Sequence, residues 1–390
     1  MTQVYETDWL ASRPIFYNER TGKVSYNIND VIDLADLEFD PEGFNNYLDF
    51  GYSVFEQTLI KHVKFLRHSS RLTIHDDGRL EVEYLDDPVE QWLGKTSHED
   101  DVLDRLETTV RRWEESVEGD IIIPTSGGYD SRLLNFLIED KSRIRSLTYG
   151  ISENQAESYE VVYAKKLSEV LGTRWEQIEL GDFHHYFDDW DRLFGVSTHA
   201  HGMYHIEFYR KILAKVGEGR PLLGGIIGDA WAGSVKMLKV NHSGELFILG
   251  YTHGLRADPG QSLLKDDGKL REGYFNKMHE KLLHPVRNVV EAMRFKIVLL
   301  SYLLIIPETS GFRPWSPFLD PSIALGMATL PPERRKDRLW QCEFFRKHGL
   351  DFEAMNLRAS HQNTLDWQAL RRIPVKPLDT HILRELIKPD

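Results

Sequence analysis

The sequence of 390 residues contains a single cysteine, Cys342. A lone thiol cannot form an intrachain disulfide and provides at most one metal ligand, so the sequence excludes a disulfide framework and a cysteine-based zinc site. Such low cysteine usage is typical of proteins in reducing compartments. The first eight residues also lack the basic and apolar segments of a signal peptide. We therefore expect a cytoplasmic protein.

Long hydrophobic runs and an excess of basic residues are also missing. The longest apolar run, residues 297–306, is interrupted by Ser301. Because a membrane-spanning helix needs about 20 apolar residues, this run predicts a buried helix and no membrane partner. The 48 basic residues are outnumbered by 61 acidic ones, which gives a net charge of −13. This charge argues against a nucleic-acid partner bound by a general basic surface, but it is compatible with a local basic pocket for a nucleotide.

The most informative stretch is residues 121–138. An apolar β-branched run, Ile121–Ile123, leads into the loop Ser126-Gly127-Gly128, and Asp130 and Ser131 then open an amphipathic segment. This order predicts a strand, a tight turn and a helix. Two glycines allow close backbone approach to an anion, and the amide groups at the start of a helix favour phosphate. The stretch therefore predicts a phosphate-binding loop.

The side chains of this loop add detail to the prediction. The hydroxyl groups of Ser126 and Ser131 can donate hydrogen bonds to phosphate oxygens, whereas Asp130 would repel them. A Mg²⁺ ion between Asp130 and the phosphates removes that conflict. No lysine follows the glycines, so the stretch is not a P-loop of the G-x-x-x-x-G-K-[ST] type. The loop resembles the pyrophosphate loop of the N-type ATP pyrophosphatases, and this resemblance implies that the phosphate ligand is ATP, bound together with Mg²⁺.

Strands and helices alternate along the chain after about residue 98. We predict helices over 98–118 (capped near Ser97) and 159–171, strands over 121–125, 146–150, 175–180 and 221–225, and mostly helix from 275 onward. This alternation predicts a doubly wound parallel sheet that binds its ligand at the carboxyl ends of the strands. Thr148, Tyr149 and Gly150 would then border the adenine. Residues 1–97 are β-rich and include a hairpin with Asp77-Gly78 at its turn.

Several stretches resemble the asparagine synthetase and β-lactam synthetase family of N-type ATP pyrophosphatases. Ser126–Ser131 resembles the family's pyrophosphate loop, S-G-G-x-D-S. Residues 159–164 and 171–173 resemble D-E-x-x-Y-A and L-G-T, with Tyr159 in place of the Asp. Residues 224–233 stand where the family has S-G-E-G-x-D-E-x-x-G, and residues 311–320 resemble R-x-P-F-L-D. Lys336 and Leu339 match a late K-x-x-L element, and the resemblance covers roughly residues 98–350.

This resemblance implies an adenine nucleotide α-hydrolase-like synthetase domain over residues 98–390. It implies an amide ligase that adenylates a carboxylate, releases pyrophosphate and passes the acyl group to ammonia or an amine. Asp130 and Asp229 would hold Mg²⁺, Gly225 would contact the nucleotide, and Lys336 would stabilise the acyl-transfer transition state. Other interpretations remain for single residues, since Asp229 also fits a helix N-cap and Lys336 lies in a charge run typical of solvated surfaces.

The first 97 residues resemble the latter part of the family's glutaminase domain. That domain uses an N-terminal cysteine as nucleophile, whereas residue 2 here is Thr2. An N-terminal threonine can act as a nucleophile in principle, but the surrounding residues do not match. We therefore predict a truncated β-rich remnant of an Ntn-type domain, without glutaminase activity. A homodimer is compatible with the sequence.

Two departures from the family concern the acyl acceptor. Ile226 and Ala230 replace the two glutamates of S-G-E-G-x-D-E. A different amine, or a bulkier and less polar substrate near Ile226 and Trp231, would suit these residues. Two other functions remain open, which are a non-catalytic member of the family and an enzyme that adenylates a sugar or tRNA.

Two further groups of residues have several interpretations. Arg313 can pair with Asp320 or with a substrate. His199, His201 and His205 fit a metal site, a substrate pocket or a plain surface, since His201 and His205 would share one face of a helix.

Overall fold

The computed structural model describes residues 2–250, 253–373 and 381–388. Its centre is a five-stranded parallel sheet with the strand order β11-β10-β7-β8-β9. The strands are β7 (Ile121–Pro124), β8 (Ile144–Thr148), β9 (Arg174–Gln177), β10 (Pro221–Leu223) and β11 (Arg313–Trp315). Three consecutive isoleucines of β7 are fully buried, as expected for the central strand of a parallel sheet. The mixed α/β class with a parallel sheet is confirmed.

The direction in which strands are added to this sheet reverses at β7. The chain passes from β7 through α4 (Tyr129–Leu137) to β8, and through α5 (Tyr159–Leu171) to β9. It then crosses through α7 (Tyr204–Val216) to β10 on the other side of β7, where Leu222 is in register with Ile122. Such a reversal leaves a crevice at the carboxyl ends of the two central strands. The loops after β7 and β10 meet there.

The helices around the sheet are formed by amphipathic sequences. On α3 (Glu99–Ser116), Val102, Leu106 and Val110 face inward at a spacing of four residues, and three acidic residues occupy the first turn. The predicted cap at Ser97 is wrong, because His98 is the N-cap residue and the Ser97 hydroxyl is 2.8 Å from that of Thr329.

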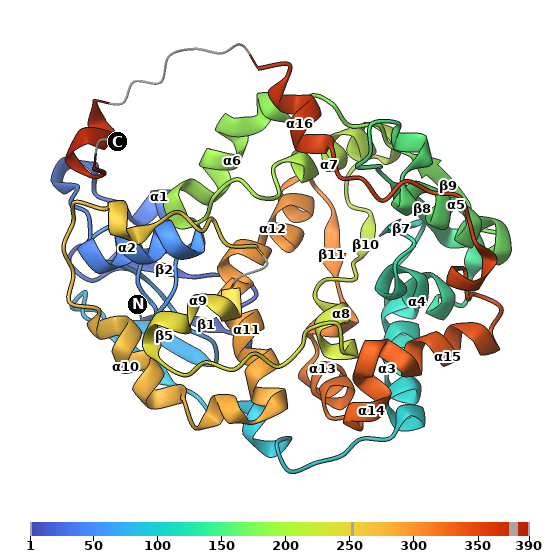
Figure 1. The fold of residues 1–390 in the computed structure, drawn as a ribbon, viewed down its shortest axis with the longest axis horizontal. Coiled ribbons are helices and arrows are strands. Elements are labelled where there is room, and N and C mark those ends of the chain that lie inside the picture. Colours follow the sequence, from blue (N-terminus) through green and yellow to red (C-terminus); the bar gives the residue numbers. More distant parts are fainter. Residues whose placement is uncertain (1, 251–252, 374–380, 389–390) are drawn as a thin grey trace.

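The remaining helices include α13 (Pro321–Ala328) and α15 (Leu339–Lys347), which pack near α3 and α4 respectively in Figure 1. The region from residue 275 to the end of the described chain is mostly helical, as predicted.

The predicted single helix over residues 297–306 is two helices. They are α11 (Pro285–Leu300) and α12 (Tyr302–Thr309), and Ser301 lies between them with its hydroxyl donating to the Val298 carbonyl at 2.7 Å. The polar side chain bonds back to the preceding turn, which is a local alternative to a continuous helix. Within the described residues, every helix is too short or too polar to cross a bilayer.

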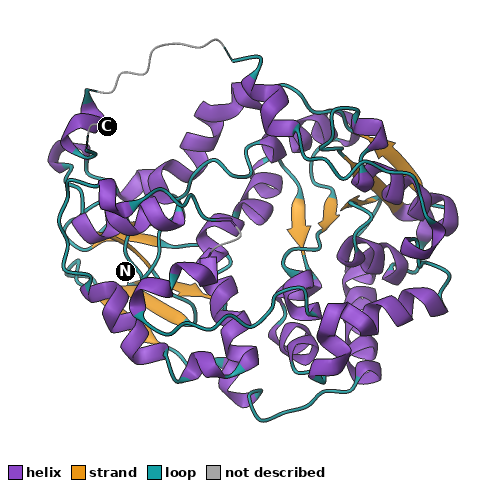
Figure 2. Cartoon of the chain, in the orientation of Figure 1, coloured by secondary structure: helices purple, strands orange, loops and turns teal. Residues whose placement is uncertain are grey.

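The N-terminal region forms two small antiparallel sheets (Figures 1 and 2). One contains β1 (Gln3–Thr7), β5 (Ser70–Ile74) and β6 (Leu80–Tyr84), and the other contains β2 (Phe16–Asn18), β3 (Val24–Ser25) and β4 (Val63–Phe65). The predicted hairpin is confirmed as β5–β6, with Gly78 at a φ of +83° in its turn. The relation of this region to an Ntn-type domain stays a prediction.

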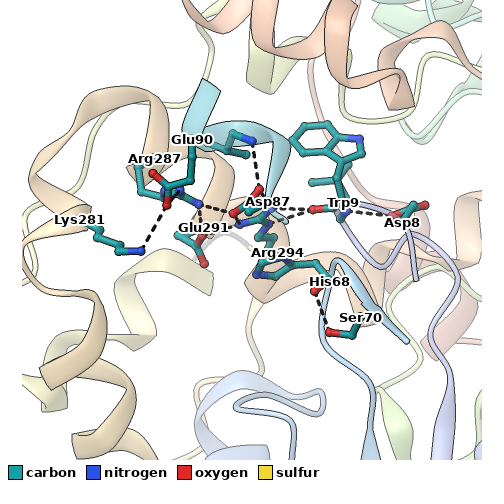
Figure 3. Close-up of polar contacts among 12 residues, drawn as sticks. Asp8, Trp9, His68, Ser70, Asp87, Glu90, Lys281, Arg287, Glu291 and Arg294 are labelled. Atoms are coloured by element: carbon teal, nitrogen blue, oxygen red, sulfur yellow. Dashed lines mark hydrogen bonds and ion pairs between the residues drawn. The ribbon is translucent and has the colours of Figure 1, made fainter. Parts of the chain in front are cut away.

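A buried ionic cluster joins the N-terminal region to α11 (Figure 3). Arg294 donates to both carboxylate oxygens of Asp87 at 2.8 Å, to Glu291 at 2.8 Å and to the Trp9 carbonyl. Arg287 donates to Asp87 at 2.6 Å and to Glu291 at 3.4 Å. We call Asp87, Arg287, Glu291 and Arg294 the ionic cluster. Each charge in it has an opposite charge within hydrogen-bonding distance, which a buried ion pair requires.

Candidate functional site

The loop after β7 has the backbone that its glycines predict. Gly127 has a φ of +69°, and a Cβ atom on it would lie 2.4 Å from the Cβ of Tyr163 on α5. Only glycine fits this position. The Ser126 amide donates to the Ser131 hydroxyl at 3.2 Å, and that hydroxyl donates to the Gly128 carbonyl at 3.2 Å. The two serines therefore hold the loop in shape at the start of α4.

The loop after β10 packs directly against Asp130. A Cβ atom on Gly225 would lie 3.1 Å from the Cβ of Asp130, and one on Gly228 would lie 2.9 Å from its Cγ. Ile227 between them has a φ of +51°, an unfavourable conformation for a β-branched residue. Close packing and local strain together bring α8 (Gly228–Ala232), which carries Asp229, to the side of Asp130.

The two carboxylates of this site have different surroundings. Asp229 is exposed and accepts a hydrogen bond from Ser234 at 2.7 Å, whereas the Oδ1 atom of Asp130 is buried without a hydrogen-bond partner. Burial and the nearby charge of Asp229 together raise the pKa of Asp130 to about 8, although the Asp229 backbone amide, Arg338 and Gln341 act against them. Asp229 does not cap a helix, because Ile227 is the N-cap residue of α8. The helix N-cap interpretation of Asp229 is therefore wrong.

These carboxylates fit a magnesium ion that is shared with phosphate. A buried carboxylate oxygen beside a second carboxylate is the donor set that Mg²⁺ commonly uses together with phosphate oxygens and water. Residues 2–250, 253–373 and 381–388 contain no group of three or more His, Cys, Asp or Glu side chains that could hold a metal ion by themselves. A Mg²⁺ ion at Asp130 and Asp229 would therefore need phosphate oxygens or water as its other ligands.

The carboxylates open into a cavity of about 860 Å³, which we call the main cavity. This volume is near the upper end of the ~300–1,000 Å³ typical of small-molecule sites. The predicted residues that line it are Ser126, Gly128, Asp130, Ser131, Thr148, Tyr149, Gly225 and Asp229. Residues from three separate segments of the sequence, 126–131, 148–149 and 225–229, are thus brought to one place.

Two predicted glycines have a packing role instead. Gly127 and Gly150 do not line the main cavity. Gly127 fits against α5, and a Cβ atom on Gly150 would lie 2.2 Å from the Gln155 carbonyl oxygen. Both glycines shape the turns that carry the lining residues.

Lys336 is placed differently from its sequence prediction. It is exposed and does not line the main cavity, whereas Arg338, two residues further on, does. Asp337 and Arg338 both have positive φ, and this sharp turn leaves the Arg338 guanidinium 4.4 Å from the centre of the Tyr129 ring. The charge run 334–338 indicated a basic element near the site, but its spacing did not identify which residue turns inward.

The predicted histidines do not form a metal site. His199 shares a hydrogen bond of 2.9 Å with the Gly51 carbonyl through Nδ1, while His205 is buried and lines the main cavity, with Nε2 3.5 Å from the Tyr149 hydroxyl. Burial lowers the pKa of His205 to about 3, so this imidazole is neutral at pH 7. Among the described residues, His199, His201 and His205 are not part of any group that could hold a metal ion. His205 fits the substrate-pocket interpretation, because it lines the main cavity.

Several other predicted residues have structural roles. Trp231 is fully buried, donates to the Phe318 carbonyl at 3.0 Å and packs on Trp9, so it does not shape the main cavity; Ile226 does. Arg313 donates to the Gly219 carbonyl at 2.9 Å, and Asp320 caps α13.

The sequence reasoning missed the helical side of the main cavity. This side includes Lys296 and Met293 from α11 and Leu303 from α12. These residues lie in segments without a recognisable motif, and only the fold brings them opposite the loops.

Comparison with known proteins gives little guidance. No family model matches the chain, and no curated protein matches it. Among solved structures, it is similar to the NH3-dependent NAD synthetase from Campylobacter jejuni subsp. jejuni NCTC 11168 in complex with the nitrate ion. The sequence identity is 15%, the match covers 54% of this chain and 93% of that chain, and the TM-score is 0.25. Because that TM-score is low, the site is interpreted from its own geometry alone.

Proposed function

We propose that this protein is an ATP-dependent ligase that forms AMP and pyrophosphate. It adenylates a substrate carboxylate and transfers the acyl group to ammonia or an amine. The observation that supports this most is the pair Asp130 and Asp229 at the carboxyl ends of β7 and β10. Both residues line a cavity of nucleotide size, and the Oδ1 atom of Asp130 is buried without a hydrogen-bond partner. Two neighbouring carboxylates with a buried, unpartnered oxygen destabilise the ligand-free protein, whereas they could bind the Mg²⁺ ion of a magnesium nucleotide.

The loop residues would bind the triphosphate of ATP. The amide groups at the start of α4 and the hydroxyl groups of Ser126 and Ser131 offer donors to phosphate oxygens. Asp130 and Asp229 would hold Mg²⁺, which supplies positive charge against the phosphates. Thr148 and Tyr149 border the side of the cavity where the adenine would lie, and Arg338 offers a cation to the departing pyrophosphate.

The reaction needs activation because a carboxylate has a poor leaving group and does not react with an amine at neutral pH. A carboxylate oxygen of the acyl donor would attack the α-phosphorus of ATP. The bond from that phosphorus to the bridging oxygen would break, and pyrophosphate would leave with the electron pair. The amine would then attack the acyl carbon, lose a proton to solvent and displace AMP. The main task of the protein is to align these groups and to balance their charge.

The test is exchange of labelled pyrophosphate into ATP in the presence of a panel of carboxylic acids. The Asp130→Asn variant is expected to lose at least about 100-fold in exchange rate, the scale of an essential electrostatic contact. Asp120→Asn is the matched control, since Asp120 pairs with Arg174 at the far, amino-terminal end of β7. Unchanged exchange in the Asp130 variant would show that the site assignment is wrong.

Non-catalytic nucleotide binding is the second candidate. Ala230 favours it, because a buried methyl group on α8 stands where the resembled family has a glutamate. The two candidates separate in one measurement. A protein that binds ATP in calorimetry, yet supports no exchange with any acid or acceptor, is a binding protein.

A further inference from the structure

The main cavity has two unlike halves. The half formed by the loops carries the cavity's acidic side chains, which are Asp130, Asp229 and Glu160. The opposite half is formed by α9 (Phe247–Gly250), α11 and α12, which Figure 1 shows near the centre of the molecule, across from β7 and β8. Apart from Lys296 and Tyr302, the side chains that these helices contribute are apolar, namely Ile248, Leu249, Ala292, Met293, Leu300 and Leu303. A nucleotide would occupy the half formed by the loops, so the apolar half is available to another part of the substrate.

One cation is set into the apolar half. Lys296 on α11 lines the main cavity and is only 5% exposed. It lies one helical turn from Met293 and Leu300 and is close enough to Asp229 for their charges to interact. The other cations of the cavity are at its edge, since Lys236 is exposed and Arg338 stands over Tyr129. Lys296 therefore marks the point where the apolar half meets the loops.

This position fits a requirement of the reaction. The carboxylate that attacks ATP must approach a phosphate of the same charge, and a fixed cation beside both groups makes that approach favourable. The rest of the acyl donor then extends away from the loops. Among the described residues, the walls there offer no carboxylate that would bind the ammonium group of an amino acid. They offer mainly methyl, methylene and thioether groups, together with the ring of Tyr302.

We propose that the acyl donor is a carboxylic acid with an apolar aliphatic or aromatic body, bound with its carboxylate on Lys296 and its body against α9, α11 and α12. This inference rests on the proposed function and narrows its substrate to one chemical class. It also separates two cations by task, with Lys296 on the acyl donor and Arg338 on the pyrophosphate side.

The first experiment measures pyrophosphate exchange with phenylacetate and hexanoate against L-aspartate and succinate. Binding of the same four acids is measured by calorimetry with a non-hydrolysable ATP analogue present. Phenylacetate or hexanoate is expected to bind and to support exchange. Exchange with aspartate or succinate alone would overturn the inference and leave the proposed function intact. Binding of the ATP analogue without binding of either apolar acid would also overturn it, whereas failure of the analogue itself to bind counts against the proposed function.

The second experiment uses variants of the apolar half. Lys296→Met is expected to weaken binding of the apolar acid about 10- to 100-fold, the range for loss of a charged hydrogen bond, while the affinity for the ATP analogue stays the same. Lys296→Arg should restore part of the affinity, which a purely structural lysine would not predict. The matched control is Lys239→Met, an exposed lysine outside the cavity lining.

A third variant covers the case in which Lys296→Met does not fold. Leu303→Trp adds bulk to the apolar wall and is expected to discriminate against hexanoate relative to acetate by at least about 10-fold, since overfilling a packed pocket is unfavourable. An unchanged preference between the two acids in a folded Leu303→Trp variant would overturn the placement of the acyl donor.

Discussion

The molecule contains two groups of carboxylates whose electrostatic surroundings are opposite. In the ionic cluster, Asp87 would have a raised pKa from burial alone, but hydrogen bonds and charge from Arg294 and Arg287 hold its pKa well below its usual range. At the main cavity, burial and Asp229 raise the pKa of Asp130 to about 8, and one of its oxygens has no partner. Asp87 is therefore paired with cations within the folded protein, whereas Asp130 lacks, among the described residues, a cation that fully offsets its burial and the charge of Asp229.

This difference separates structural charge from functional charge. The four charged side chains of the ionic cluster neutralise one another, and their ion pairs hold the N-terminal region to α11. The Asp130 site retains repulsion between like charges that the fold could have removed. Unfavourable electrostatics of this kind is typical of sites that are completed by a ligand.

The largest effect is expected from breaking the ionic cluster. Arg294→Met leaves the buried Glu291 and the half-buried Asp87 with less positive charge, and removal of one partner from a buried ionic group costs about 3–5 kcal/mol. Urea unfolding should show that loss. Arg13→Met is the control, because Arg13 forms an exposed pair with Glu308, where the expected loss is below about 1 kcal/mol. An equal loss of unfolding free energy in the two variants would mean that the buried ion pairs of the cluster contribute no more to stability than an exposed pair.

A smaller effect is expected from the two candidate cations of the basic run. Arg338→Met should lower pyrophosphate exchange by about 10- to 100-fold, because the guanidinium lies at the main cavity and opposes the acidic pair. Lys336→Met should change the rate less than about threefold, since this side chain is exposed. The reverse order would favour the residue predicted by resemblance and would mean that the run 334–338 rearranges when ATP binds.

The contrast between Lys336 and Arg338 shows where sequence reasoning ends. The strand, turn and helix at Ile121–Ser131 were predictable because local patterning and glycine requirements coincide there. The helix 159–171 was predicted to the residue, since Gly172 ends it in the left-handed conformation. The parallel sheet followed from the alternation of strands and helices.

The rest depended on long-range packing. Nothing local in residues 334–338 shows that two successive residues take positive φ and turn Arg338 inward. Lys296 and the apolar wall have the sequence of an ordinary core helix, and they become a site only because α11 lies opposite the loops. The raised pKa of Asp130 likewise depends on Gly225 and Gly228, which pack against it. The sequence shows the two glycines but does not show that Asp130 is the residue they contact.

Removal of the charge on Asp130 should have the opposite effect on stability from removal of Arg294. An asparagine at this position cannot ionise, so Asp130→Asn removes the cost of either taking up a proton on folding or burying a charge beside Asp229, and we expect the ligand-free protein to gain about 0.5–2 kcal/mol while exchange activity is lost. Thermal unfolding without nucleotide or magnesium measures the gain. A loss of stability above 1 kcal/mol would mean that Asp130 is a structural residue like Asp87.

The pH dependence of stability tests the same comparison in a second way, because the two groups should give slopes of opposite sign. The folded-state pKa of Asp130 is raised to about 8, so the folded protein binds a proton that the unfolded chain has released. Its stabilising contribution is present at acidic pH and is lost as the pH rises toward 8, with a slope of at most about 1.4 kcal/mol per pH unit. Asp87 has a lowered pKa and contributes stability that is lost only as the pH falls below the range of ordinary carboxylates. Unfolding of the ligand-free protein between pH 5 and pH 8 (roughly the window that separates the two groups) should show the falling limb, and Asp130→Asn should flatten it. A limb that is unchanged in Asp130→Asn would mean that another group titrates there and that the main cavity does not hold an unsatisfied acid.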